Sequence, residues 1–474
     1  MGNSGTYPLP AATVVAAMRR EPKVAWTGLD LCRATGMSSG RLYATLYRLE
    51  HAGIVTPMWT PITPIAGTRA AGTAPARGRR TYALAEPHGA TQPTAAERRG
   101  GQAGRRQRRL YVLAAWFAVA VVAIVQATQA LARPTAGRLS DLDVYVGAVT
   151  YLRHGGGLYD YVTADGAPFT YPPFAGLLFW PLTFVARWPL QAWWTVATIA
   201  SVLGIAAFVG RRIGVPIPIV AIVLLLSAPV SSNLRFGQVS VVLAALVIAD
   251  VTVLQRRRRF GVLTGITAGV KLTPLIVIPL LWRAGRRRAA ITAVAAFACC
   301  AAVGYAVLPE DSRRFWGYAM WHVERLGHVA VAGNQSLDGA LMRLGVADPI
   351  RSAIALMLGG TVAVLAIRRA GWAARAGDWY SAMVIVGAAS VVASPVSWTH
   401  HQIWLVMAAG LPVAASTRGR WAWVLLVVAV MLLPSTTIGS MLGWPPLEDS
   451  RLLLAIATAC IVPIAVEPVG ASPP

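Results

Sequence analysis

Apolar stretches long enough to cross a membrane recur along most of this chain. Between residues 110 and 466, stretches of roughly 15 to 22 apolar residues alternate with short connections rich in arginine, or in proline, glycine and tryptophan. A helix needs about 20 apolar residues to cross the hydrocarbon core of a bilayer. Only 13% of the 474 residues are charged, about half the usual share in a soluble domain. The sequence therefore predicts an all-α polytopic membrane protein.

The arginines are clustered, and the clusters predict how the helices are oriented. Each cluster adjoins an apolar stretch, which is typical of cytoplasmic loops. Placing every cluster in the cytoplasm predicts about ten to twelve transmembrane helices.

Two segments need a different description from a single span. Residues 261–282 have arginine clusters on both sides, so we expect a hairpin broken near Lys271. Residues 174–186 do not fit this alternation and are either a re-entrant or interfacial segment or a short span. The clusters lie at residues 98–109, 211–212, 256–259, 283–288, 368–369 and 418–420.

Three polar loops fall on the outer side in this arrangement, at residues 133–170, 309–349 and 394–401. The protein is thus expected to be a multi-pass protein of the cell membrane with its chemistry on the extracytoplasmic face. The four cysteines lack the spacing of metal ligands, so we expect no metal site and no disulfide.

The first outer loop contains two carboxylates, Asp141 and Asp143, directly after the first apolar stretch. Either could act as a general base or bind a substrate hydroxyl at the membrane surface. The alternative is a solvated pair that only caps a helix.

The other two outer loops combine histidines with tryptophans. His322 lies in the second loop, and His400 and His401 follow Trp398 in the third. Polar groups beside tryptophan suit carbohydrate stacking, whereas an interfacial aromatic belt explains the same pattern without chemistry.

Two cations lie near apolar segments. Arg235 is at the outer end of one predicted span, and Lys271 is inside the broken hairpin. Ionisable residues in membrane segments are costly and are candidates for function. Both could bind a lipid phosphate, and snorkelling of the side chain to the interface is the competing explanation.

The chain contains a set of short motifs that, in their order and in a chain this apolar, resembles glycosyltransferase family 87. This family comprises the polyprenol-phosphate-mannose-dependent α-mannosyltransferases of actinobacteria. The resemblance covers about residues 110–466. The motifs are Asp141-Leu-Asp-Val-Tyr145, Phe169-Thr-Tyr-Pro-Pro-Phe174, Phe236-Gly-Gln238, Val270-Lys-Leu-Thr-Pro274, Asn334-Gln-Ser-Leu337 and Ser394-Pro-Val-Ser-Trp-Thr-His-His401.

The resemblance implies a GT-C fold, a polyprenyl-phosphate-linked sugar donor, a glycolipid or lipoglycan acceptor, and transfer of a hexose, mannose in the family, with inversion to an α linkage. It implies Asp141 as the general base, with Asp143 as the alternative. The donor phosphate would be bound by Arg235, Lys271, His400 and His401, and the acceptor by Tyr171, His322, Asn334 and Trp398. No cofactor is implied. Thr399 departs from the family, in which an acidic residue often precedes the histidine pair, so no mechanism here can require a carboxylate at that position.

The first residues form a separate region. We divide the chain into a small cytoplasmic domain (1–96), a basic linker (97–109), the membrane domain (110–467) and a tail (468–474). Residues 27–36 and 38–53 are expected to be helices and residues 79–84 a strand. This pattern resembles the winged helix-turn-helix of PadR-like transcription regulators, which implies that Arg41, Tyr43 and Arg48 approach DNA. A protein-binding adaptor of the same fold is the alternative.

Two other classes of function compete with the enzyme. The chain could be a membrane-tethered transcription regulator that senses a lipid through its helical domain. A transporter is disfavoured because the polar residues gather in the outer loops and no inverted repeat is visible.

Overall fold

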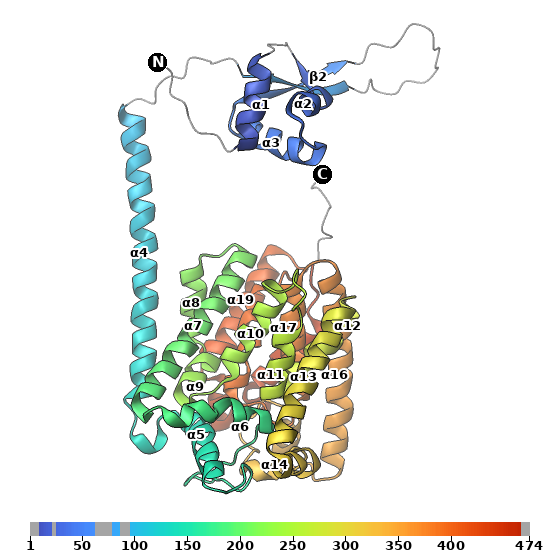
Figure 1. Ribbon diagram of the computed structural model, residues 1–474. Coiled ribbons are helices and arrows are strands. Elements are labelled where there is room, and N and C mark those ends of the chain that lie inside the picture. Colours follow the sequence, from blue (N-terminus) through green and yellow to red (C-terminus); the bar gives the residue numbers. More distant parts are fainter. Residues whose placement is uncertain (1–8, 21–24, 62–77, 86–94, 466–474) are drawn as a thin grey trace. The chain divides into compact units, whose positions relative to one another are not determined.

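The computed structural model describes residues 9–20, 25–61, 78–85 and 95–465. The chain divides into two compact units, Met1–Arg108 and Arg109–Pro474. α4 (Ala95–Leu131) runs through the division between them. The first unit combines helices with strands, and the second is a helical bundle (Figure 1).

The first unit confirms the predicted pair of helices and the strand after them. α2 is capped at its start by Thr27, whose hydroxyl accepts a hydrogen bond from the backbone N–H of Asp30, and at its end by Gly36 with φ +68°. Leu42, Leu46 and Leu49 lie at helical spacing on α3, and all three are buried. The antiparallel sheet has the order β1-β3-β2. The elements are α1 (Leu9–Arg20), β1 (Trp26–Thr27), α2 (Gly28–Thr35), α3 (Ser39–His51), β2 (Val55–Pro61) and β3 (Gly78–Leu84).

The second unit contains four described helices that are long and apolar enough to cross a membrane. They are the segment Leu110–Leu131 of α4, α7 (Arg187–Ile213), α13 (Arg287–Val307) and α16 (Ile350–Arg375). Two bent pairs could each be one further span: α8 (Ile217–Leu226) with α9 (Ala228–Phe236), bent by 63°, and α19 (Thr417–Leu432) with α20 (Ser435–Leu442), bent by 73°. The chain is therefore a multi-pass membrane protein.

The expected number of about ten to twelve spans is corrected to four, or six with the bent pairs, among the described residues. Several apolar stretches are interrupted or too short to cross alone. The break predicted near Lys271 is confirmed, because α11 (Val262–Val270) ends there and a 3-10 turn follows. Residues 173–184 form only α6 (Pro173–Phe179) and a 3-10 turn, η2 (Trp180–Phe184), not a full span. The other short apolar segments are α10 (Ser240–Thr252), Thr273–Arg283, α17 (Trp379–Ala393) and Ser450–Ile461.

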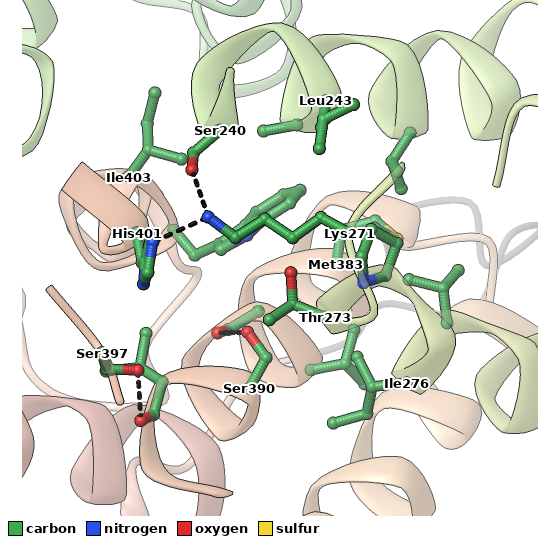
Figure 2. A pocket seen from close by; sticks show the side chains of 18 residues that line it. Ser240, Leu243, Lys271, Thr273, Ile276, Met383, Ser390, Ser397, His401 and Ile403 are labelled. Atoms are coloured by element: carbon green, nitrogen blue, oxygen red, sulfur yellow. Dashed lines mark hydrogen bonds between the residues drawn. The ribbon is translucent and has the colours of Figure 1, made fainter. Parts of the chain in front are cut away.

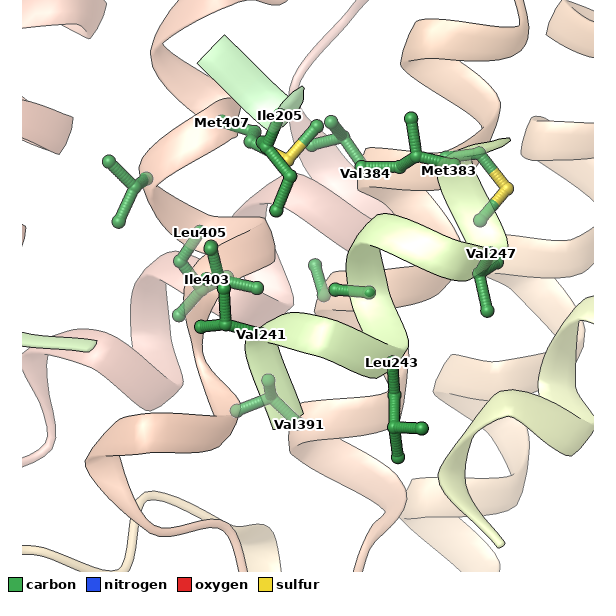
Figure 3. Packing of buried hydrophobic residues seen from close by; sticks show 14 of the residues in the cluster. Ile205, Val241, Leu243, Val247, Met383, Val384, Val391, Ile403, Leu405 and Met407 are labelled. Atoms are coloured by element: carbon green, nitrogen blue, oxygen red, sulfur yellow. The ribbon is translucent and has the colours of Figure 1, made fainter. Parts of the chain in front are cut away.

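The shortened helices form the core of the bundle. α17 is buried along nearly its whole length and packs against α16 and α18 (Ile403–Met407). Val241, Leu243 and Val247 of α10 belong to the same buried cluster as Met383, Val384 and Val391 of α17 (Figure 3). A helix surrounded by protein does not need the length that contact with lipid requires, which explains why apolar composition overestimated the number of spans.

The three predicted outer loops contain short helices and contact one another. The backbone N–H of Leu158 in the first loop donates to Asp311 Oδ1 in the second, at 2.8 Å. The second joins the third where Asn334 Oδ1 accepts from the N–H of Ser397, at 2.9 Å. α5 (Ser140–Arg153), α6 and α14 (Pro309–Arg314) lie together at one end of the bundle (Figure 1).

The remaining elements of the second unit are short. They are η1 (Thr135–Gly137), η3 (Thr273–Ile276), α12 (Val277–Arg283), η4 (Phe315–Ala319), η5 (Val323–Leu326), α15 (Leu337–Arg343), η6 (Thr399–His401), η7 (Ala408–Gly410), α21 (Pro445–Glu448), α22 (Ser450–Ile456) and η8 (Ala457–Ile461).

Candidate functional site

Asp141 lies in the first turn of α5, outside the candidate spans. Its Oδ2 accepts a hydrogen bond of 2.6 Å from Nε2 of Gln238. Gln238 can come this close because Gly237 precedes it with φ +68°, and a Cβ there would lie 2.9 Å from Cβ of Leu139. Burial raises the pKa of Asp141 to about 6, against the opposing effects of Gln238 and Lys271. A carboxylate of this kind is poised to accept a proton near neutral pH.

The carboxylate of Asp141 determines which way the Gln238 amide points. An ionised carboxylate can only accept hydrogen bonds, so the N–H₂ end of the amide faces Asp141 and the carbonyl end points away from it. The hydroxyls of Tyr145 and Tyr171 each lie 3.0 Å from Gln238 Oε1 and 2.8 Å from each other. Gln238 therefore orients the carboxylate and links it to the tyrosines.

Lys271, at the break after α11, forms the next part of the network. Its Nζ donates to Ser240 Oγ at 3.0 Å and lies 2.7 Å from Nε2 of His401 (Figure 2). An ammonium group can only donate, so Nε2 of His401 accepts and the ring proton is on Nδ1. The Nζ also lies 5.4 Å from the centre of the Tyr171 ring.

The two histidines are held in different ways. Their rings meet edge to face, with centroids 4.5 Å apart. His400 Nδ1 lies 3.5 Å from Ser232 Oγ, and its Nε2 has no hydrogen-bond partner among the described residues. Burial, together with the charge of Lys271, lowers the pKa of both rings well below the usual range. Both are therefore neutral hydrogen-bonding groups, and Lys271 is the cation beside them.

A cavity opens beside Lys271 and His401. Its empty space, part of which is open to solvent, is about 640 Å³. Lys271, Ser240 and His401 lie at a polar part of the wall, and apolar side chains from α10, α12 and α17 make up most of the rest (Figure 2). Such a cavity can take a molecule with one anionic and one apolar part.

Asp143 and Arg235 do not join this network. Asp143 forms an ion pair with Arg187, and the pKa of Asp143 is raised by burial, with Arg187 opposing the shift. Arg235 is exposed, and its guanidinium lies 4.9 Å from the ring centre of the neighbouring Phe236. The structure thus separates both from the group around Asp141 and Lys271.

The four residues predicted to bind an acceptor are dispersed. Tyr171 belongs to the network. His322 stacks on Tyr318, with ring centroids 3.8 Å apart, and Trp398 is half-buried before η6. Asn334 is buried, and its side chain bonds the backbone of Val329 and Ser397. The observed contacts of Asn334 join two loops.

Tyr145, Gln238 and Ser240 are the members of the network to which the sequence assigned no role. Gln238 stands in the Phe236-Gly-Gln238 motif, directly after a bent span. A glutamine within an otherwise apolar run was the available signal. No group of three or more His, Cys, Asp or Glu side chains that could hold a metal occurs among the described residues.

The residues predicted to approach DNA lie on one helix of the first unit. Arg41, Tyr43 and Arg48 are all exposed on α3. Arg80 of β3 is also exposed and forms two 3.0 Å hydrogen bonds with the Glu50 carboxylate. This leaves Arg41 and Arg48 as the exposed cations of that helix without a carboxylate partner among the described residues.

The family model and the known proteins that match this chain are described as glycosyltransferases or mannosyltransferases. The model of glycosyltransferase family 87 matches residues 169–395, a range that contains Tyr171, Gln238 and Lys271. The polyprenol-phosphate-mannose-dependent alpha-(1-2)-phosphatidylinositol mannoside mannosyltransferase of Mycobacterium tuberculosis is 32% identical over 65% of this chain and 76% of its own length. The corresponding phosphatidylinositol pentamannoside mannosyltransferase of Mycolicibacterium smegmatis is 33% identical, over 58% of this chain and 69% of its own length. No solved structure matches the chain.

Proposed function

Since this chain belongs to glycosyltransferase family 87 and is a membrane glycosyltransferase, we propose that it transfers mannose from a polyprenyl-phosphate donor to a phosphatidylinositol mannoside. The donor and acceptor come from the names of its relatives. The observation that carries the proposal is the continuous network from Asp141 through Gln238 and Ser240 to Lys271 and His401. It supports the proposal because it joins a carboxylate that could accept a proton to a cation that could bind a phosphate.

The proposed reaction is a single inverting displacement. The acceptor hydroxyl gives its proton to Asp141, and its oxygen forms a bond to C1 of the mannose. The bond from C1 to the phosphate oxygen breaks, and its electron pair leaves with the phosphate. Phosphate is a good leaving group, so one general base is enough and no second carboxylate is required. A β-linked donor then gives an α-linked product.

The cavity supports a donor of this kind. The phosphate would be bound by Lys271, with the neutral His401 and His400 beside it. The first isoprene units would occupy the apolar part between α10, α12 and α17. Arg235 is exposed at the end of α9 and is proposed only as a contact for the incoming lipid phosphate.

The proposed acceptor site and the proposed orientation in the membrane rest on the positions of the loops and of the arginine clusters. Tyr171 is the predicted acceptor residue that lies inside the network, and His322, Asn334 and Trp398 come from the loops that surround it. The arginine clusters support an outward-facing site and a cytoplasmic first unit. Asp143 remains an alternative base, although its ion pair with Arg187 makes it less available.

The pH dependence of transfer tests the proposed base. The purified chain in lipid nanodiscs is expected to transfer labelled mannose from the lipid donor at a rate that rises as the pH increases from 4.5 to 7. Because Asp141 must be ionised and its pKa is about 6, kcat/KM for the acceptor should fall about tenfold per pH unit well below pH 6. A profile level down to pH 4.5 would rule out a base with this pKa.

We also propose that the first unit is a winged helix that contacts DNA through α3. The order of its helices and strands and the exposed Arg41, Tyr43 and Arg48 support this. The full chain in nanodiscs is expected to bind DNA from around its own gene. Arg41→Ala combined with Arg48→Ala should weaken binding about tenfold or more and reduce its salt dependence. If the wild type does not bind DNA, or if the double variant binds it equally well, the first unit would be a protein-binding adaptor. A change in DNA binding that depends on the lipid would favour a membrane-tethered regulator.

A further inference from the structure

Arg451 is a buried cation without a counter-ion. It lies in the first turn of α22, and its side chain is 3% exposed. No carboxylate pairs with it among the described residues. Two other arginines whose side chains are mostly buried differ in this respect: Arg343 pairs with Asp449, and Arg351 with Asp338. A buried charge without a partner is costly, so its presence calls for an explanation.

The hydrogen bonds of Arg451 leave part of its guanidinium free. Its Nη1 lies 3.4 Å from Thr399 Oγ1, and its Nε lies 3.4 Å from the carbonyl oxygen of Val430. Both bonds are long, and Nη2 makes no hydrogen bond to a described residue. A guanidinium with a free N–H pair can bind a phosphate oxygen.

Arg451 and Lys271 reach the same short helix, η6, from its two ends. Lys271 contacts His401, and Arg451 contacts Thr399, with His400 between them in the chain. The Nε2 of His400 is also buried and unpartnered. Two cations and an unsatisfied imidazole nitrogen therefore gather around three consecutive residues.

We propose, resting on the function proposed above, that Arg451 is the second cation that binds the phosphate of the lipid-linked donor. The charges support this assignment. Before transfer, Lys271 and Arg451 balance the ionised Asp141 and the singly charged phosphodiester. After transfer, Asp141 holds the proton of the acceptor, and the released polyprenyl phosphate carries two negative charges. The two cations balance the site in both states, whereas Lys271 alone would leave one negative charge uncompensated.

The competing explanation is that Arg451 only caps α19 through the carbonyl of Val430. Three changes separate the explanations. Arg451→Gln removes the charge. Thr399→Asp keeps Arg451 in place but gives it a carboxylate partner, which should stabilise a capping arginine and compete with a phosphate. Arg451→Lys keeps the charge without the planar fork.

The test measures binding of polyprenyl phosphate to the full chain in nanodiscs, together with donor and acceptor kinetics. Arg451→Gln and Thr399→Asp are each expected to weaken polyprenyl phosphate binding and to lower kcat/KM for the donor at least about tenfold. Arg451→Lys should retain more of both. Thr399→Asp should keep the wild-type melting temperature. Arg343→Gln is the control: it removes another buried arginine, and it should lower stability without changing donor kinetics.

Three results would overturn the assignment. The first is unchanged polyprenyl phosphate binding in Arg451→Gln with only a lower melting temperature. The second is Thr399→Asp that is stabilised and fully active, and the third is a change confined to the KM of the acceptor. Because phosphate binding is measured without turnover, a chain that binds polyprenyl phosphate through Arg451 but transfers no mannose would contradict the proposed reaction and not this site.

Discussion

Asp141→Asn is expected to slow mannose transfer by about 10³-fold without unfolding the protein. A positioned general base contributes about 10² to 10⁴ in rate, and Asp141 is the carboxylate that the network holds beside Lys271. Asparagine has nearly the same shape and can still bond Gln238 after its amide rotates, so the melting temperature should change little. The measurement is initial rates of transfer at saturating donor, with the KM of the donor determined in parallel.

Asp143→Asn is the matched control, because it lies two residues away on the same helix. Its carboxylate is occupied by Arg187, so we expect the rate to fall by less than about fivefold. If Asp143→Asn abolished transfer and Asp141→Asn retained it, the base would have to be reassigned to Asp143.

Lys271→Met is expected to lower kcat/KM for the donor by about 10² to 10³, the usual loss when a group that stabilises developing charge is removed. Lys271 lies between Ser240 and His401 at the polar part of the cavity (Figure 2). Its loss removes the cation nearest the histidine pair, and methionine preserves the length and apolar contacts of the stem. Product formation at varied donor concentration measures the effect.

Two comparisons help to interpret the result for Lys271→Met. Ser240→Ala removes a hydrogen bond to Lys271 but no charge, and it should reduce kcat/KM for the donor by much less than Lys271→Met. The acceptor KM should be nearly unchanged in both variants. A Lys271→Met protein that is folded and uses the donor as well as the wild type would show that the phosphate binds elsewhere.

Much of the candidate site was predictable because its residues are chemically unusual where they stand. Lys271 is a cation in an apolar stretch, and Asp141 is a carboxylate just after one. Membrane segments make such residues expensive, so their presence is informative. The structure places both, with His401, in one network.

The sequence did not identify Gln238 or Arg451 as residues of the site, and the physical reason differs between the two. Gln238 carries no charge, and its role depends on Gly237 allowing α9 to approach α5, which is a tertiary contact. Arg451 resembles any arginine at the edge of an apolar stretch. Only its burial and its lack of a carboxylate among the described residues make it distinctive, and neither property is visible in the sequence.

The number of spans was overestimated because composition does not show where a helix bends. The pair α8 and α9 bends by 63° at Ser227, which precedes Ala228 and Pro229. The pair α19 and α20 bends by 73° around Pro434. Proline lacks the N–H that would continue the helical hydrogen bonds, so the breaks themselves have a local cause. Whether each broken piece lies within protein or against lipid depends on its neighbours.

The most direct test of the proposed function is the product itself. The purified chain would be given polyprenyl-phosphate mannose labelled at C1 and a phosphatidylinositol mannoside, and the anomeric configuration of the added sugar would be determined by nuclear magnetic resonance. We predict one added mannose in α linkage per polyprenyl phosphate released, and product formation about 10³-fold slower with Asp141→Asn. Absence of transfer from the lipid donor, or a β-linked product from a β-linked donor, would contradict the account.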